Sequence, residues 1–292
     1  MASIAIGDIA VARIEELSGP IFDPKSLIPD WNREAIEPHL GWLLPDHFDT
    51  VTGNLVGSFH SWLLRTPHHT ILVDTCVGND KERPAFERFH RAHHPWLDNL
   101  RAAGVAPEDI DIVMCTHLHV DHVGWNTRLE NGRWVPTFPN ARYLFSRADR
   151  DYWDPATGRT AMAMNDVIFN DSVLPVIESG QADLVEGVHE IEDGLTIHPA
   201  PGHTPGNMIL KAASGDARGI FAGDCLHHPI QIYHPEWNAS VDEDPPLAHA
   251  TRRAIFEECA ERRSLLLPAH FAAPHAGHVR RKAEGFAFDF LL

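Results

Sequence analysis

Residues 110–124 read Ile-Asp-Ile-Val-Met-Cys-Thr-His-Leu-His-Val-Asp-His-Val-Gly, and this stretch decides the fold. Its first six residues are mostly apolar and predict a buried strand. The run that follows carries His117, His119, Asp121 and His122. His117 and His119 are two residues apart, so in extended backbone both imidazoles leave the chain on the same side. Imidazole and carboxylate groups at this spacing predict a metal site at the end of a strand.

Three later stretches each place one further ligand-type residue directly after an apolar run. They are residues 202–206 with His203, residues 222–225 with Asp224, and residues 268–271 with His270. An α/β sheet places its site at such strand ends. Together with the first motif they make seven ligand candidates, which are too many for one tetrahedral zinc site. The sequence therefore predicts two metal ions a few ångströms apart.

Short apolar runs alternate with turn residues along most of the chain, which indicates one α/β domain over residues 1–292. We expect strands over residues 55–65, 70–74, 110–115, 141–146, 195–199, 219–222 and 265–267. Helices are expected over residues 83–103, with a break at Pro95, and over residues 245–261. Residues 17–54 are rich in proline and tryptophan and predict an ordered N-terminal extension that forms part of a substrate entrance or of a homodimer contact.

Composition narrows the class of partner and the compartment. The 292 residues carry a formal charge of −17, and the basic residues are scattered, which disfavours nucleic acid as a partner. The four cysteines lie far apart and predict free, buried thiols in a reducing cytoplasm. The first residues lack the pattern of a signal peptide, and no apolar run is long enough to span a membrane. We therefore expect a cytoplasmic protein that acts on a small molecule.

In order and approximate spacing, the motifs T-H-x-H-x-D-H, G-H-T-P-G, G-D and a late A-H resemble those of the metallo-β-lactamase fold hydrolases. The resemblance covers about residues 55–275 and implies a four-layer αβ/βα sandwich with the metals at one edge between two sheets. It also implies the ligand sets: one metal takes His117, His119 and His203, the other takes Asp121, His122 and His270, and Asp224 bridges them together with a water or hydroxide.

This ligand set implies a dinuclear metal-dependent hydrolase, because two divalent cations that share a water make hydroxide available at neutral pH and stabilise a developing oxyanion. Zinc suits an imidazole-rich site, although iron, cobalt or manganese could occupy it. Asp121 is expected to orient the nucleophile or to pass a proton to the leaving group. A lactone or a carboxylic ester is the expected substrate.

Two alternatives stay open. Lactonases of this fold usually carry a tyrosine three residues after the bridging aspartate, whereas this chain has His227 there, so His227 is a candidate substrate-facing residue. The stretch after Asp224 looks more like the methyl parathion hydrolase group, which implies an organophosphate triesterase. A metal-containing binding or sensing protein without turnover is the alternative from another class. Aromatic candidates for the wall of an apolar pocket, each with core packing as the other interpretation, are Phe48, Trp125, Trp153 and Trp237.

Overall fold

The fold comes from a computed structural model, which describes residues 4–157, 159 and 162–291. The chain divides into two compact units. Unit 1 comprises Met1–Leu17 and Phe59–His189, and unit 2 comprises Ser18–Ser58 and Glu190–Leu292. Strands β2 (Ile9–Phe22) and β4 (Asn54–Arg65) are long enough to contribute residues to both units. The organisation of residues 1–292 as one domain stays a prediction.

Unit 1 is built on four neighbouring parallel strands. These are β5 (Thr70–Val73), β6 (Ile112–Met114), β9 (Arg142–Ser146) and β10 (Ala182–Val185). They belong to an eight-stranded sheet of order β1-β2-β4-β5-β6-β9-β10, with β3 paired to β4. The same sheet contains β1 (Ile4–Ile6) and, from the residues of unit 2, β3 (Phe48–Asp49), and unit 1 also has a separate hairpin of β7 (Thr127–Glu130) and β8 (Arg133–Pro136). Because β5 and β6 are parallel neighbours, the loops that follow them leave the sheet at the same edge.

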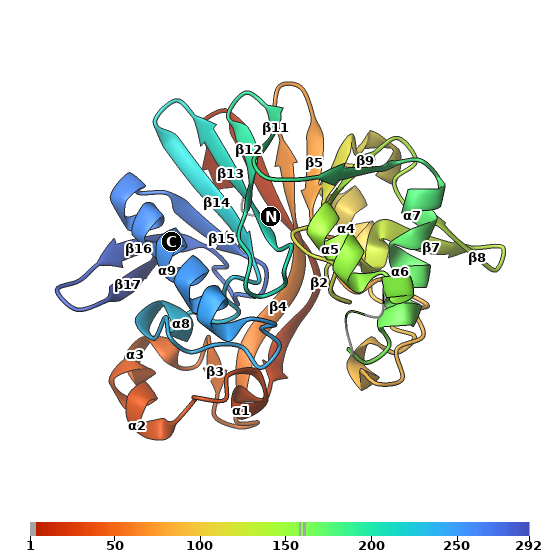
Figure 1. The fold of residues 1–292 in the computed structure, drawn as a ribbon. Helices are drawn as coiled ribbons and strands as arrows, with labels where there is room; N and C mark the ends of the chain where they lie inside the picture. The colour runs from red at the N-terminus through yellow and green to blue at the C-terminus, as the bar shows by residue number, and fades with distance from the viewer. Residues whose placement is uncertain (1–3, 158, 160–161, 292) are drawn as a thin grey trace. The chain divides into compact units, whose positions relative to one another are not determined.

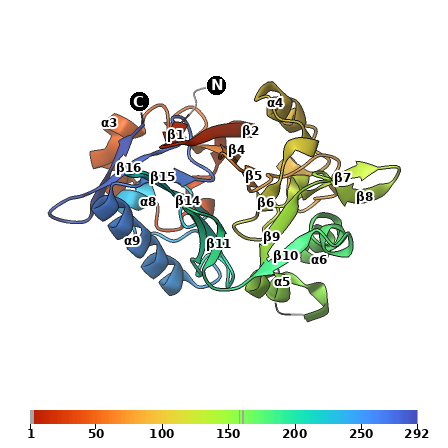
Figure 2. The same cartoon turned by 90° about the horizontal axis from the view of Figure 1, so that it is seen from above.

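Unit 1 also contains the α-helices α4 (Trp96–Ala102), α5 (Arg147–Trp153), α6 (Asn165–Ser172) and α7 (Leu174–Glu178). Of these, α4, α5 and α6 are labelled beside its sheet in Figure 2. Trp96 of α4 and Trp153 of α5 are fully buried in one apolar core with Leu72 of β5, Val113 of β6 and Tyr143 of β9. This core fixes the strands whose ends carry the first histidine motif.

Unit 2 is built on a seven-stranded sheet in which the strands follow one another in chain order. The strands are β11 (His189–Glu192), β12 (Leu195–Pro199), β13 (Met208–Ser214), β14 (Ala217–Gly223), β15 (Leu265–Pro268), β16 (Gly277–Arg281) and β17 (Phe286–Phe290). Strands β14 and β15 are parallel. Asp224 and His270 therefore follow the carboxyl ends of two neighbouring strands, as the sequence pattern predicts.

The long helix α9 (Pro245–Arg262) lies against this sheet (Figure 1). Asp244 begins it, because its carboxylate accepts a hydrogen bond from the backbone N–H of Leu247 at 3.1 Å. Ile255 and Phe256 of the helix pack against Ile220 of β14 and the neighbouring strands in one buried core. The helix confirms the prediction over residues 245–261 to within one residue.

Residues 18–58 form an ordered part of unit 2. They contain the short helices α1 (Pro24–Leu27), α2 (Arg33–Ile36) and α3 (Leu40–Leu43). Trp31 and Leu43 are buried together with Ile230 of helix α8 (Ile230–Tyr233) and with Trp237. The segment thus supports the chain that follows Asp224, while its role at a substrate entrance or in a dimer stays a prediction.

The prediction of a helix over residues 83–103 is wrong for the first half of that range. The structure has a helix only over Trp96–Ala102, preceded by a 3₁₀ turn at Glu87–Phe89. Arg83 is fully buried and bonds both oxygens of Asp171 at 2.7 Å, and Arg91 has a positive φ of 49°. These long-range and backbone constraints outweigh the local helical pattern.

All four cysteines are free and buried, which confirms the prediction of free, buried thiols. Among the helices in the described part of the chain, none has the length and apolar character needed to cross a membrane.

Candidate metal centre

Asp74, at the end of strand β5, contacts residues 116–122, the loop of unit 1 that carries four predicted ligands. It follows β5 with a φ of 61°, a conformation that is uncommon for a residue other than glycine. Its carboxylate accepts a hydrogen bond from the backbone N–H of Thr116 at 2.7 Å and lies 2.9 Å from Nδ1 of His122. The buried Asp74 carboxylate thereby fixes both the start of the loop and the ring of a predicted ligand.

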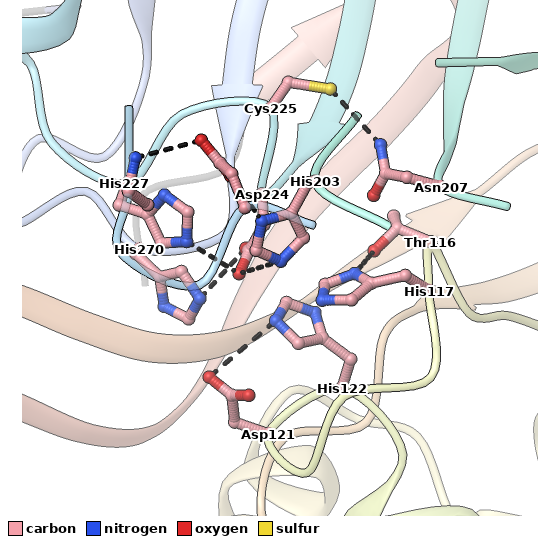
Figure 3. A network of polar contacts seen from close by, with 12 residues as sticks. Thr116, His117, Asp121, His122, His203, Asn207, Asp224, Cys225, His227 and His270 are labelled. Carbon is pink, nitrogen blue, oxygen red and sulfur yellow. Dashed lines mark hydrogen bonds and ion pairs between the residues drawn. The ribbon is translucent and has the colours of Figure 1, made fainter. Parts of the chain in front are cut away.

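The rings of His117 and His122 in this loop face each other (Figure 3). The ring centroid of His117 lies 4.6 Å from that of His119 and 4.0 Å from that of His122. Asp121 points an oxygen at Nε2 of His122, at 3.7 Å, and its side chain is 16% exposed, whereas the histidines are buried. The structure therefore brings together all four predicted ligands of unit 1.

Backbone contacts hold the same loop. Gly124 donates its N–H to the carbonyl of Cys76 at 2.7 Å. A Cβ on Gly124 would lie 1.8 Å from the carbonyl oxygen of Val77, so only glycine allows this approach. Glu16 of β2 accepts hydrogen bonds from the backbone N–H of Val77 and from the indole N–H of Trp125, both at 2.8 Å. Burial raises the pKa of Glu16 to about 7, although these hydrogen bonds act to lower it.

In unit 2 three histidines surround the carboxylate of Asp224 (Figure 3). Nε2 of His270 lies 3.0 Å from Oδ1 of Asp224. Nε2 of His203 and of His227 lie 3.5 Å and 3.1 Å from Oδ2. All four side chains are at least nine-tenths buried. Each oxygen of the carboxylate is thus faced by a different predicted ligand.

The second ring nitrogen of four predicted ligands faces an oxygen within the same unit. Nδ1 of His117 lies 3.0 Å from Thr116 Oγ1, and Nδ1 of His122 lies 2.9 Å from Asp74 Oδ2. Nδ1 of His203 lies 2.8 Å from Asp242 Oδ1, and Nδ1 of His270 lies 3.1 Å from the Ser58 carbonyl oxygen. Metal-ligating histidines have this arrangement, because an acceptor on one nitrogen keeps the lone pair on the other. The residues present therefore fit a divalent metal such as zinc.

Asp242 shows this tautomer control in detail. Burial is the largest single influence on the pKa of its carboxyl and acts to raise it, yet the hydrogen bond with His203 and the charges of His203, His227 and Arg252 together hold the pKa below its ordinary value. A carboxylate can only accept, so Nδ1 of His203 carries the proton. Nε2 of His203 then presents its lone pair.

His227 differs from these ligands. Its backbone N–H donates to Oε1 of Gln231 at 2.7 Å, which fixes its place in the loop. Within the described part of the chain, Nδ1 of its ring has no hydrogen-bond partner. The ring lies parallel to that of His270, with centroids 5.6 Å apart, and burial lowers its pKa. His227 is therefore a neutral imidazole whose tautomer is not fixed through Nδ1.

The aromatic residues considered as pocket walls are mostly core residues. Trp125 stacks on Trp96 with centroids 5.6 Å apart, and Trp237 stacks on His234 at 4.2 Å. Trp153 is 1% exposed and packs against a predicted ligand, because its ring centroid lies 5.0 Å from that of His119. Phe48 is half-buried and packs on Trp31. Core packing is thus the correct interpretation for the three tryptophans.

The residues that orient the predicted ligands were missed in the sequence analysis. Asp74, Asp242 and the carbonyl of Ser58 are far in sequence from the histidines they contact. Asp74 alone carried a signal, since it stands directly after an apolar strand as the ligands do.

Comparison with known proteins identifies the class of this fold and site. The family model of the metallo-beta-lactamase superfamily matches residues 55–282. The chain belongs to that superfamily, and the resemblance drawn from the motifs is confirmed.

Individual relatives share short stretches of sequence with this chain. An N-acyl homoserine lactonase from a Bacillus species is 27% identical over 111 residues, which is 38% of this chain and 36% of the relative. A ribonuclease Z from Mycobacterium sp. (strain KMS) is 28% identical over 139 residues, 44% of this chain and 47% of the relative. The matches thus span between a third and a half of these curated relatives.

A solved structure matches over the whole chain. AidC, described as a dizinc quorum-quenching lactonase in complex with a product, superposes with a TM-score of 0.80 and 22% identity, covering 100% of this chain and 97% of its own. This likeness confirms the expected metallo-β-lactamase fold and its α/β class.

Proposed function

We propose that the chain is a dinuclear metal-dependent hydrolase that cleaves a lactone or a carboxylic ester. The observation that carries the proposal is the environment of Asp224. Its Oδ1 is faced by His270 and its Oδ2 by His203, so each oxygen lies beside a histidine assigned to a different metal. This environment suits a carboxylate that bridges two cations.

Seven residues would hold the two metals. They are His117, His119, Asp121 and His122 from unit 1, with His203, Asp224 and His270 from unit 2. When bound, two divalent cations supply hydroxide at neutral pH and polarise the bond to be cleaved. Zinc is the metal we propose, because imidazole dominates the donor set.

Asp121 and His227 are the residues that we propose act on the substrate. Asp121 is more exposed than the buried histidines beside it, so its carboxylate can reach the reacting groups and accept or return a proton. His227 stands where related lactonases have tyrosine. Its Nε2 faces Asp224, so Nδ1, which has no hydrogen-bond partner within the described chain, is the ring nitrogen that can donate a hydrogen bond to a carbonyl oxygen.

A small, neutral or weakly charged substrate suits this chain better than RNA. The formal charge of −17 repels a phosphate backbone, which disfavours the activity named for the ribonuclease Z relative. The names of the Bacillus relative and of AidC support a lactone. Phosphotriesters remain a comparison substrate, because the same hydroxide can attack phosphorus.

The test is a panel of lactones, aryl esters, thioesters and phosphotriesters, assayed with protein purified without chelator. We expect close to two equivalents of transition metal per chain by elemental analysis, and the highest kcat/KM on a lactone or carboxylic ester. Chelation should abolish turnover and added zinc should restore it. Two bound metals with no turnover on any substrate would favour the binding or sensing alternative. One metal after supplementation would contradict the dinuclear centre.

A further inference from the structure

Arg252 is a fully buried guanidinium in the middle of helix α9. It donates hydrogen bonds to five acceptors, all in unit 2. These are the carbonyls of Cys225 (2.7 Å), Pro235 (2.7 Å) and Trp237 (3.0 Å), Asn238 Oδ1 (3.3 Å) and Asp242 Oδ2 (3.3 Å). Removing a guanidinium from water is costly, and an apolar residue would fill the same helix position without that cost. The pattern of acceptors therefore calls for an explanation beyond packing.

Three of these acceptors lead directly to the candidate metal centre. Cys225 follows Asp224 in the chain, so the bond to its carbonyl restrains the backbone that carries the proposed bridging carboxylate. The carbonyl of Trp237 also accepts from Nε2 of Gln231 at 2.9 Å, and Gln231 in turn holds the backbone N–H of His227. One side chain thereby restrains the loops on both sides of α8.

The third connection runs through Asp242 to His203. Oδ1 of Asp242 faces Nδ1 of His203 at 2.8 Å. Its Oδ2 accepts from the backbone N–H of Ala239 at 2.9 Å and from Arg252. Two donors on Oδ2 prevent the carboxylate from turning away, so Oδ1 stays on His203.

We propose that Arg252 is a positioning residue, which acts through Asp242 to fix the orientation and the Nδ1–H tautomer of His203 and through Cys225 to fix Asp224. This inference rests on the proposed function for its metal, but the tautomer of His203 is a property of the protein alone. Removing residues that hydrogen-bond to metal ligands in this way lowers metal affinity about 10- to 100-fold.

The first experiment measures zinc affinity of the full chain by competition with a chelator. We expect Arg252→Met to weaken zinc binding about 10- to 100-fold. Arg253→Gln is the matched control, because Arg253 is the exposed neighbour on the same helix, and its recorded partners are Glu257 and the ring of Phe286 rather than any predicted metal ligand. It should bind zinc like the wild type. Thermal unfolding with and without zinc separates a structural role, which lowers both temperatures equally, from positioning, which reduces the gain on adding zinc.

A lysine variant tests whether charge alone suffices. Arg252→Lys keeps the positive charge, but an ammonium cannot reach the Cys225 carbonyl and Asp242 with the fork geometry of a guanidinium. We expect it to remain weaker than the wild type. Wild-type affinity in Arg252→Lys, or in Arg252→Met, would overturn the positioning role.

The second experiment needs no metal and remains available if Arg252→Met does not fold. In Asp242→Asn the amide oxygen should stay with the N–H groups of Ala239 and Arg252, which turns the amide NH₂ toward Nδ1 of His203. His203 must then carry its proton on Nε2. Nitrogen-15 NMR of the histidine rings in metal-free protein should show Nδ1–H in the wild type and Nε2–H in Asp242→Asn. An unchanged tautomer would overturn the relay. Absence of zinc binding by the wild type would instead contradict the proposed function.

Discussion

The two units hold their predicted ligands in different ways. In unit 1 all four predicted ligands come from one loop, and backbone contacts anchor that loop, as in the close passage of Gly124 over Val77. In unit 2 the predicted ligands come from three separate strand ends, and buried side chains such as Asp242 and Arg252 hold them in place. We infer that a loop motif needs a fixed backbone path, whereas dispersed ligands need a network of polar side chains.

The largest expected effect is that of replacing Asp224, the residue proposed to bind both metals. Comparison with Asp121, which is assigned to one metal, tests that proposal. Asp224→Asn should lose or weaken at least one metal and lower kcat by several orders of magnitude, because the amide nitrogen cannot coordinate a cation. Asp121→Asn should lose less metal than Asp224→Asn, since Asp121 is assigned to one ion. Elemental analysis and kcat for both variants make the comparison. Two metals and full activity in Asp224→Asn would show that the bridge is assigned wrongly.

The backbone anchor of unit 1 is tested by Gly124→Ala. The added Cβ would lie 1.8 Å from the Val77 carbonyl oxygen, so the backbone must move. We expect a loss of about 2–3 kcal/mol in the free energy of unfolding, measured by urea denaturation of metal-free protein. Gly132→Ala is a control for a glycine with open space, because no atom lies within 4 Å of its Cβ position. That control retains the cost of a positive φ, so an equal loss in both variants would argue against the close approach.

The side-chain anchor of the same loop is tested by Glu16→Gln. At pH 8, above the raised pKa of about 7, the carboxylate accepts three N–H groups, from Val77, Gly78 and Trp125. An amide places its NH₂ against at least one of these donors, which we expect to cost about 1–3 kcal/mol of stability in urea unfolding. Glu15→Gln, at the partly exposed neighbour, should stay close to the wild type. Equal stability of the two variants would contradict the anchor.

The buried contact between His47 and His228 in unit 2 should make the free energy of unfolding fall in acid. His228 lies with Nε2 2.9 Å from the His47 carbonyl, and burial lowers the pKa of His47 to about 4 and that of His228 to about 3. These folded-state values lie below the unfolded value of about 6.5. Stability from neutral histidine is therefore complete above pH 6.5 and is lost as the pH falls toward 4, by up to about 1.4 kcal/mol per pH unit for each group.

The variant His47→Phe removes one of these groups and keeps an aromatic ring against Phe290. Between pH 6.5 and 4.5 its unfolding free energy should fall less steeply than that of the wild type, in metal-free protein. His68→Gln, at an exposed histidine, should leave the slope unchanged. A wild-type slope in His47→Phe would contradict the assignment.

The sequence predicted the parts of this molecule that depend on local pattern. The strand before His117 and the strand over residues 195–199 are short apolar runs, and helix α9 follows a Pro-Pro pair with apolar residues at helical spacing; the structure has all three. The long strand β2 and the network around the ligands were missed. Asp242 lies 39 residues from His203, and the Ser58 carbonyl lies 212 residues from His270, so their contacts depend on tertiary folding. Buried Arg252 carried no signal, because its neighbour Arg253 makes the pair look like an exposed basic cluster.

The smallest expected effect concerns His227, which shares the environment of the unit 2 ligands without the acceptor on Nδ1 that characterises them. Because that nitrogen has no hydrogen-bond partner within the described chain, His227→Ala removes no bond on that side and should retain both metals. If the ring contacts the substrate, its loss should change the ranking of substrates, by about tenfold in the ratio of kcat/KM between a lactone and an aryl ester, which corresponds to about 1.4 kcal/mol. His227→Tyr, which installs the residue of related lactonases, should shift the same ratio toward the lactone. Loss of a metal in His227→Ala would make the ring a ligand, and an unchanged ratio in both variants would place it outside the substrate site.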